Sequence, residues 1–328
     1  MLTLPNPARR VTAIALAIAV VAGAAIAGTG AAAAPAGVVG PQLAVDANTA
    51  GRSAAAQNLT PAGSKLFLFT NGTDDRGLWV IDSDGTATRL VDLGAISAPK
   101  MIAMPGDTGV VVFTKYTPEH GIELWRSDGT VGGTRLVRDI WVGTPGTTLG
   151  NFTQYRGEVY FTASQPGTGD ELWKTDGNDA WLVADLNQGN ASSRPSRLRS
   201  VWHGPGDERL WMFAESGFSV NRLVVYNGNV DEATDVFVGV RPTDFVDVKG
   251  TVYATATTTA GSNDETIFRI EVTGDTTYTA TAVVAQNVSS MIGYGDQLLL
   301  SATVPAYGTE LFRLAGATLE LLADIRPG

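Results

Sequence analysis

One motif returns along the chain at nearly constant spacing, and this repetition limits the possible folds more than any other feature. The motif reads Glu-Leu-Trp-Arg-Ser-Asp-Gly-Thr at 123–130, and altered copies occupy 77–86, 171–177 and 310–313. Its hydrophobic anchor recurs at steps of 44 to 51 residues. A period of this length is typical of propellers, solenoids and other repeat arrays. The six anchors are Trp79, Trp125, Trp173, Val224, Phe268 and Phe312.

Each repeat holds four short runs with the composition of β-strands. One run precedes the anchor, as at 65–70 and 157–162, another follows it, as at 88–93, and a weaker run opens the unit. Gly, Pro, Asn and Asp separate these runs, and no helical periodicity appears after residue 35. Four strands in so short a unit predict an antiparallel meander of the size of a propeller blade. We therefore expect an all-β fold, a β-propeller of four-stranded antiparallel blades, with a flat solenoid as the alternative.

The Asp-Gly pairs follow each clear anchor and are predicted to turn the hairpin between the third and fourth strands. Such pairs accept the positive φ of a type I′ turn. Because anchor and turn both repeat, we interpret them as scaffold, in which the aromatic anchor packs one blade on the next. The turn residues are Asp84, Gly85, Asp128, Gly129, Asp176 and Gly177.

The number of blades follows from counting strands. The first three strands occur six times, but the fourth has seven candidates, of which 42–47 is the extra one. We expect six blades over 58–328, preceded by a segment, 35–57, with a strand that could close the ring. A seventh, incomplete blade is the alternative.

Residues 1–34 have the pattern of a secretory signal peptide. Arg9 and Arg10 precede an apolar run at 11–27, and small residues follow to Ala34. An uncleaved membrane anchor is the alternative, although a run of 17 Ala-rich residues is short for a bilayer span. We expect a secreted or cell-surface protein with no stable membrane span after cleavage. Since there is no cysteine, its stability must come from a large core and not from disulfides.

The charge balance bears on the partners. The chain carries 23 Lys and Arg against 33 Asp and Glu, a net charge of −10. An acidic chain lacks the basic surface with which proteins bind nucleic acids and anionic membranes. We therefore expect no nucleic-acid partner.

The repeat resembles that of a bacterial family named for its ELWxxDGT motif, whose unit continues with Gly-Thr and then Leu-Val-x-Asp-Ile. Residues 169–186 match this unit except at Asn178, and the later units match it less well. The resemblance implies a secreted, propeller-like tandem-repeat protein and brings no catalytic residues with it. The closest match is 121–143, through Gly121, Glu123, Leu124, Trp125, Asp128, Gly129, Thr130, Gly133, Thr134, Leu136, Val137, Asp139, Ile140 and Gly143.

No recognisable catalytic or cofactor motif is present. The chain has two histidines and no cysteine, so a zinc or copper cluster is not expected, and Gly-x-Ser-x-Gly and phosphate-loop patterns are absent. Asp82 and Asp84 open a segment that begins like a calcium loop, but Leu93 occupies the position of the bidentate acid. Calcium bound by these two residues is one interpretation, and ordinary turn acids are the other.

Candidate ligand-binding residues lie in loops that propeller geometry assigns to one face. Trp141 indicates binding because it interrupts a polar loop, although packing against the next blade is the alternative. We expect a non-enzymatic recognition module for an extracellular protein or polysaccharide. A glycan hydrolase or lyase that uses two face carboxylates, or a structural envelope repeat without a ligand, are the alternatives. The candidate residues are Tyr116, Glu119, His120, Trp141, Asp170, Asp264 and Tyr307.

Overall fold

The computed structural model describes residues 55–72, 76–216, 220–228, 234–236, 241–257, 265–285 and 287–325. All of them belong to one compact unit, 47–328. The expected signal peptide, the extra strand at 42–47 and Asp264 lie outside the described residues. Within those residues, no helix is long and apolar enough to span a membrane.

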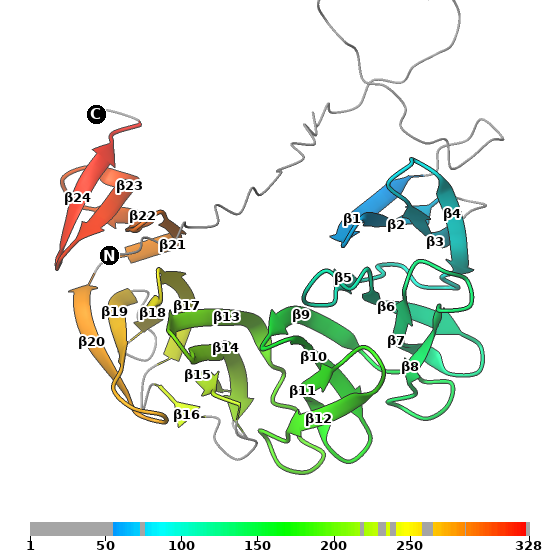
Figure 1. Cartoon of the computed structure of the whole chain (residues 1–328). Coiled ribbons are helices and arrows are strands. Elements are labelled where there is room, and N and C mark those ends of the chain that lie inside the picture. The colour runs from blue at the N-terminus through cyan, green and yellow to red at the C-terminus, as the bar shows by residue number, and fades with distance from the viewer. Residues whose placement is uncertain are drawn as a thin grey trace, which may run out of the picture. The chain divides into compact units, whose positions relative to one another are not determined.

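The described residues form six sheets, each made of four consecutive antiparallel strands hydrogen-bonded in chain order (Figure 1). We number the sheets 1 to 6 along the chain. Sheet 1 comprises β1 (Ala56–Ala62), β2 (Lys65–Asn71), β3 (Arg76–Ile81) and β4 (Ala87–Asp92). Sheet 2 comprises β5 (Met101–Ala103), β6 (Val111–Thr117), β7 (Gly121–Ser127) and β8 (Arg135–Arg138). Sheet 3 comprises β9 (Leu149–Tyr155), β10 (Glu158–Gln165), β11 (Gly169–Thr175) and β12 (Ala180–Ala184).

The second half repeats this pattern. Sheet 4 comprises β13 (Ser196–Gly204), β14 (Asp207–Ser216), β15 (Val220–Tyr226) and β16 (Thr234–Asp235). Sheet 5 comprises β17 (Arg241–Val248), β18 (Thr251–Thr257), β19 (Glu265–Val272) and β20 (Tyr278–Ala285). Sheet 6 comprises β21 (Asn287–Tyr294), β22 (Gln297–Val304), β23 (Gly308–Ala315) and β24 (Thr318–Ala323).

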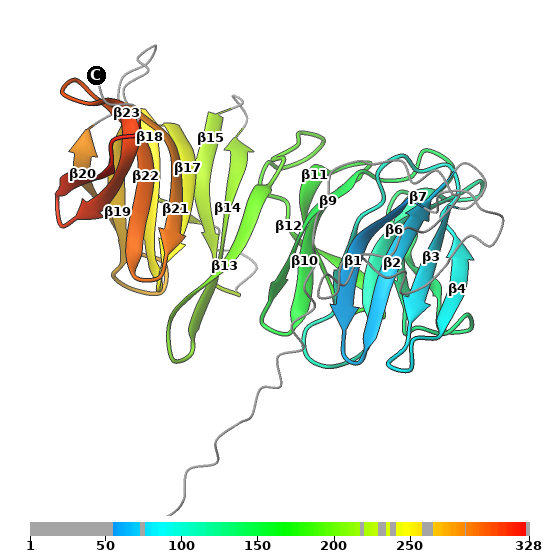
Figure 2. The same cartoon turned by 90° about the horizontal axis from the view of Figure 1, so that it is seen from above.

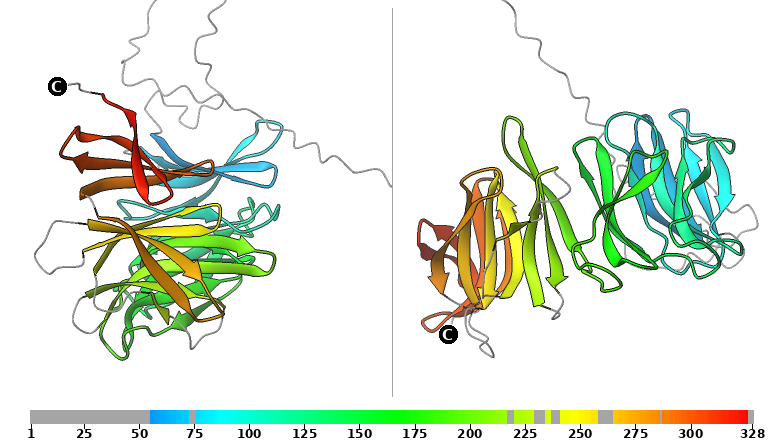
Figure 3. Two further views of the ribbon diagram at one scale, coloured as in Figure 1. Left: turned by 90° about the vertical axis from the view of Figure 1, so that its left-hand side faces the viewer. Right: turned by 90° about the horizontal axis from the view of Figure 1, so that it is seen from below.

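Consecutive sheets pack face to face through five apolar cores, one at each junction (Figure 2; Figure 3). The first strands lie next to one another: β1 contacts β5, β5 contacts β9, β9 contacts β13, and β17 contacts β21. Two ion pairs join β13 and β17, one from Arg197 to Asp244 and one from Arg199 to Asp247 at 3.0 Å. This is the stacking of propeller blades, and it confirms the predicted all-β fold with four-stranded antiparallel blades.

All six anchors lie on the third strand of their sheets, as predicted, and the five in sheets 2 to 6 pack toward the preceding sheet. Trp173 belongs to the core between sheets 2 and 3, Val224 to the next core, and Phe312 to the core between sheets 5 and 6. A large side chain is required at this position because each sheet can bury its faces only against its neighbours.

The Asp-Gly pairs do lie in the hairpins between the third and fourth strands, but the predicted type I′ turn is wrong. Gly85 has a φ of +86°, whereas Asp84 is not in the positive-φ region that type I′ requires at both positions. Gly85 N–H donates to the Asp82 carbonyl at 2.9 Å, and Asp82 N–H donates to Thr86 at 3.0 Å. This is a type I turn followed by a left-handed glycine.

The turn aspartate has a local function. The Asp84 carboxylate accepts the Thr86 N–H at 2.8 Å, and that bond holds the pKa of Asp84 below its usual value. Asp128 accepts the N–H of Thr130 at 2.9 Å in the same manner. The motif aspartate therefore stabilises the turn by bonding the backbone two residues further on.

The motif glutamate is buried and bonds the chain where it leaves the fourth strand. Glu123 is fully buried, and its carboxylate accepts the N–H groups of Ile140 at 2.9 Å and Trp141 at 3.0 Å. Glu171 accepts the N–H of Leu186 at 2.9 Å. We call this arrangement the glutamate clasp. It fixes the segment that leads into the next sheet. A third clasp joins Glu310 to Ile325 at 2.8 Å.

The clasp makes stability depend on pH. Burial raises the pKa of Glu123 to about 7, even though the N–H donors of Ile140 and Trp141 oppose that change. The unfolded chain loses this proton near pH 4.5, whereas the folded chain keeps it to about pH 7. The stabilising effect of the retained proton is complete below pH 4.5 and lost between pH 4.5 and 7, which amounts to about 3 kcal/mol.

We therefore expect the wild type to lose about 3 kcal/mol more than Glu123→Gln when the pH rises from 4.5 to 7.5, because glutamine does not titrate. Urea unfolding followed by circular dichroism at several pH values measures this difference. Parallel pH profiles for the two proteins would contradict the assignment.

Candidate functional site

The loop residues predicted to bind a ligand are divided among three sheets. Glu119, His120 and Trp141 belong to the connections of sheet 2, while Asp170 begins β11 and Tyr307 lies in the turn after β22. Glu119 and Tyr307 are exposed. Tyr116, also of sheet 2, is half-buried against the core between sheets 1 and 2.

Three of the predicted binding residues, His120, Trp141 and Asp170, make hydrogen bonds with neighbouring segments of the chain. The His120 ring bonds Asp139, with 2.8 Å between Nδ1 and Oδ2. Trp141 is half-buried, and its N–H is held by Glu123. The Asp170 carbonyl accepts the N–H groups of Ser193 and Arg194, both at 3.1 Å. These residues shape loops, whereas the predicted residue Tyr307 lines a pocket of about 410 Å³ together with Phe312 and Leu321.

The two calcium candidates lie in the first of the hairpin turns, where the Asp84 carboxylate accepts the Thr86 N–H. Among the described residues, no three His, Cys, Asp or Glu side chains gather closely enough to hold a metal ion.

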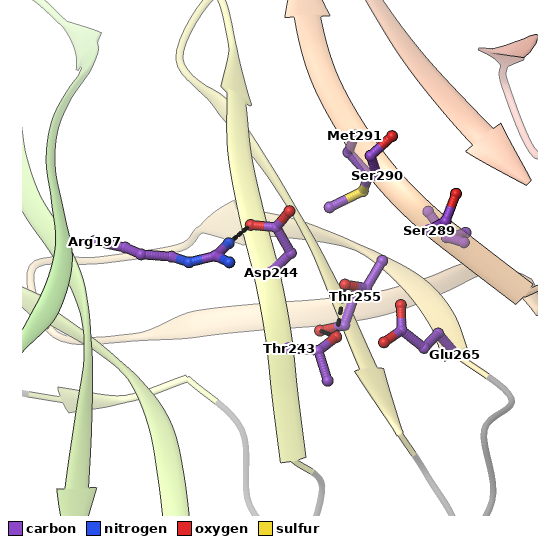
Figure 4. A pocket seen from close by; sticks show the side chains of 9 residues that line it. Arg197, Thr243, Asp244, Thr255, Glu265, Ser289, Ser290 and Met291 are labelled. Atoms are coloured by element: carbon purple, nitrogen blue, oxygen red, sulfur yellow. Dashed lines mark hydrogen bonds and ion pairs between the residues drawn. The ribbon is translucent and has the colours of Figure 1, made fainter.

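A polar groove lies instead along the first strands of sheets 4, 5 and 6. It consists of two adjoining pockets of about 140 and 360 Å³, which share Arg197, Asp244 and Met291 (Figure 4). We call it the inner-strand groove. Its further lining residues are Leu198 and Arg199 of β13, Thr243, Phe245 and Val246 of β17, Thr255, Glu265, and Val288, Ser289 and Ser290 of β21.

Bulges in the three first strands position the groove residues. The register of β13 shifts between Ser196 and Arg199, and irregularities at Thr243 in β17 and Ser289 in β21 follow the same pattern. Arg197, within the bulge of β13, has a φ of +53°. A bulge turns a side chain away from the regular alternation of a strand. Here three successive bulges bring polar side chains to one groove.

Hydrogen bonds to the second strand fix two of these bulges. Thr243 Oγ1 lies 2.8 Å from Thr255 Oγ1, and Ser289 Oγ lies 2.9 Å from Ser301 Oγ. The hydroxyls of Thr243 and Ser289 are thereby held in place at the groove.

The groove contains charges of both signs. Arg197 forms an ion pair with Asp244 across the junction of sheets 4 and 5, and Arg199 pairs with Asp247 at 3.0 Å in parallel. Figure 4 shows the Glu265 carboxylate near Thr243 and Thr255, and the structure gives it no hydrogen-bond partner within the described ranges. The groove thus presents guanidinium, carboxylate and hydroxyl groups beside the apolar surface of Met291.

Sequence reasoning missed this groove, although one signal was present. Arg194, Arg197 and Arg199 fall within six residues of an acidic chain, at the start of the fourth repeat. One repeat later, Asp244 and Asp247 stand 47 and 48 residues beyond Arg197 and Arg199. Opposite charges at the repeat spacing indicate residues that meet across a blade junction.

Fold and groove together define the chain as an all-β protein of propeller type with a polar groove at its first strands. A scan against protein-family models and a search of curated protein sequences both found no match. The chain is similar in structure to an oligogalacturonate lyase in complex with manganese, at 13% identity and a TM-score of 0.46, covering 80% of this chain and 74% of that one. It is also similar to the dihydro-heme d1 dehydrogenase NirN, at 11% identity and a TM-score of 0.49, covering 82% and 56%.

A third similar structure is a puromycin hydrolase, at 12% identity and a TM-score of 0.42, covering 86% of this chain. The chain spans about half the length of that hydrolase, 56%. Likenesses at this level assign neither an activity nor a ligand to this protein.

Proposed function

We propose that this chain is a secreted or cell-surface β-propeller module that binds an extracellular polysaccharide in the inner-strand groove. The observation that carries the proposal is the groove itself, which gathers guanidinium, carboxylate and hydroxyl groups from three consecutive sheets. Export rests on the signal-peptide pattern of residues 1–34 and on the resemblance to the ELWxxDGT-repeat family.

The lining chemistry favours a sugar chain over an apolar or nucleic-acid ligand. Sugar hydroxyls both donate and accept hydrogen bonds, so they match a surface that offers Arg197, Asp244 and the hydroxyls of Thr243 and Ser289. Met291 is 8% exposed at the groove, so the apolar contact available to a sugar ring is small and the polar groups carry the recognition. An acidic chain with balanced charge in its groove does not attract a polyphosphate backbone.

Arg197→Ala should weaken binding by about 10- to 100-fold, because a hydrogen bond to a charged group contributes about 1.5–3 kcal/mol. A polysaccharide array identifies the ligand, and titration calorimetry on that ligand then compares the variants. Arg313→Ala is the matched control, since Arg313 is also partly exposed and paired, with Glu320 of sheet 6, but does not line the groove. An array without a hit, or equal affinities for Arg197→Ala and Arg313→Ala, would refute the proposal.

An enzymatic function on the same ligand is the second candidate. Asp244 and Glu265 line one pocket, and glycan cleavage uses two carboxylates on either side of the bond. Release of reducing ends from the bound polysaccharide, lost in Glu265→Gln, would support a hydrolase or lyase. Tight binding without release would leave recognition as the function.

A further inference from the structure

The ring of His203, near the end of β13, connects sheet 4 with sheet 5. It is half-buried, and its Nε2 accepts the indole N–H of Trp211 on β14 at 3.1 Å. It also forms a hydrogen bond with the backbone of Gly250, in the turn between β17 and β18. That turn lies so close to β13 that a side chain on Gly250 would collide with the Trp202 carbonyl. One imidazole therefore holds the first hairpin of sheet 4 against the first hairpin of sheet 5.

These two hydrogen bonds fix the protonation state of the ring. An indole nitrogen can only donate, so His203 Nε2 must carry a free lone pair. The single ring proton is then on Nδ1, the nitrogen that remains to donate to the Gly250 carbonyl. Trp211 is fully buried, so no water can replace the histidine as acceptor for its N–H. The junction therefore requires a neutral imidazole.

The groups that face His203 carry charges of both signs. Burial is the main cause that lowers the pKa of His203 below its ordinary value of 6.5, while the bond to Gly250 and the nearby carboxylates oppose that change. The folded chain therefore keeps the ring neutral at a pH at which the unfolded chain already binds a proton. The charged and titratable neighbours are Asp207 and Arg209 of β14, Asp247 of β17, and Tyr278 of β20, which lies edge-on to Trp211.

A proton added to His203 removes the bond to Trp211. The Nε2–H and the indole N–H are then two donors that face each other, and a buried N–H is left without an acceptor. The new positive charge also lies near Asp247, which pairs with Arg199 at 3.0 Å. Arg199 lies opposite Trp211 in the pairing of β13 with β14, and it lines the inner-strand groove. The same proton therefore acts on a core contact and on an ion pair that both join the two sheets.

We propose that His203 is a proton-sensitive switch, which holds the junction of sheets 4 and 5 closed while the ring is neutral and loosens it, together with the inner-strand groove, when the ring is protonated. The stabilising effect is complete above pH 6.5, where the ring is neutral in the folded and unfolded chain alike. It is lost as the pH falls from 6.5 toward the lower pKa of the folded protein. The proposal does not depend on a ligand in the groove.

Hydrogen exchange of the whole chain, measured by mass spectrometry, tests this proposal. His203→Gln keeps an acceptor oxygen for Trp211 and an N–H for Gly250, but it does not titrate. Exchange rates of the wild type are divided by those of His203→Gln at the same pH, which removes the intrinsic pH dependence of exchange. Between pH 7.5 and 5.0 this ratio should rise by about 5- to 30-fold for the amides of β13 and β17. The upper limit follows because an open state with an ordinary histidine gains about 30-fold by binding its proton at pH 5.0.

His120→Gln is the matched control, because it removes the only other histidine of the chain, which bonds Asp139 in sheet 2. Its exchange in β13 and β17 should follow the wild type at both pH values. A ratio of wild type to His203→Gln that stays constant between the two pH values would overturn the proposal. So would an equal rise in β9 and β10 of sheet 3, since acid would then loosen the whole fold and not this junction.

The ¹⁵N spectrum of the wild-type histidines supplies a test that needs no variant. At pH 7.5 the His203 ring should be neutral, with its proton on Nδ1 and an unprotonated Nε2. A proton on Nε2 at this pH would overturn the proposal, because the ring could then not accept the Trp211 N–H.

Discussion

Trp211→Ala is expected to lower the free energy of unfolding by about 4 kcal/mol, the cost of removing a large side chain from a packed core. Trp211 is fully buried between sheets 4 and 5. Its indole N–H donates to His203 Nε2 at 3.1 Å, and its ring lies edge-on to Tyr278 with centroids 5.6 Å apart. The substitution leaves a cavity and an unpaired histidine nitrogen. Chemical denaturation followed by circular dichroism measures the loss.

Trp202→Ala is the matched control for this prediction. Trp202 lies on the neighbouring strand β13 and is 61% exposed. Its removal should change stability by less than about 0.5 kcal/mol. Equal losses for the two tryptophans would contradict the packing described for the junction of sheets 4 and 5.

Glu123→Ala is the second large expected effect, with a loss of about 3 kcal/mol at neutral pH. The substitution leaves the N–H groups of Ile140 and Trp141 without their acceptor, and each unsatisfied buried donor costs about 1–3 kcal/mol. Glu123→Gln should lose less, because it keeps one acceptor oxygen. Faster hydrogen exchange at the amides of Ile140 and Trp141 would identify the clasp as the cause.

Glu119→Ala serves as the control, since Glu119 is exposed in the hairpin turn that precedes β7. It should have little effect on stability or on exchange at the two amides. If both glutamate variants behaved alike, the motif glutamate would not hold the junction.

The architecture could be predicted because its signals are local and repeated. The period of 44 to 51 residues, the four strand-like runs and the anchors at 79 through 312 all act within one repeat. The anchors were found on the third strands, and the Asp-Gly pairs were found in the hairpins that follow those strands, as predicted. The prediction succeeded because both faces of each four-stranded sheet are apolar and can be buried only against neighbouring sheets of the same kind.

The turn type and the glutamate were harder to predict. An Asp-Gly pair suits both a type I′ turn and a type I turn followed by a left-handed glycine, and the length of the loop decides between them. The glutamate occurs in three of six units and was not assigned a structural role from the sequence. Its partners, such as Ile140 for Glu123, lie 15 to 17 residues away and bond through backbone N–H groups that any residue provides.

The groove could not be predicted because it depends on tertiary geometry. Arg197 and Asp244 come from different sheets, and their approach requires the bulges that turn both side chains to one side. No local pattern encodes a bulge when the inserted residue is an ordinary Arg, Thr or Ser. The predicted binding residues were chosen for being exposed in loops, whereas the groove formed along strands.

The junctions of this molecule are held by different forces along its length. In sheets 2 and 3, the buried carboxylates of Glu123 and Glu171 accept hydrogen bonds from the segments that follow the fourth strands, and ions in solution do not reach them. Sheets 4 and 5 carry Arg222 and Thr266 at the clasp position, and the partly exposed pairs Arg197–Asp244 and Arg199–Asp247 join these two sheets beside their apolar core. Exposed pairs weaken as ionic strength rises, whereas buried groups are screened far less. Added salt is therefore expected to weaken the ion pairs that line the inner-strand groove more than the buried clasps of Glu123 and Glu171.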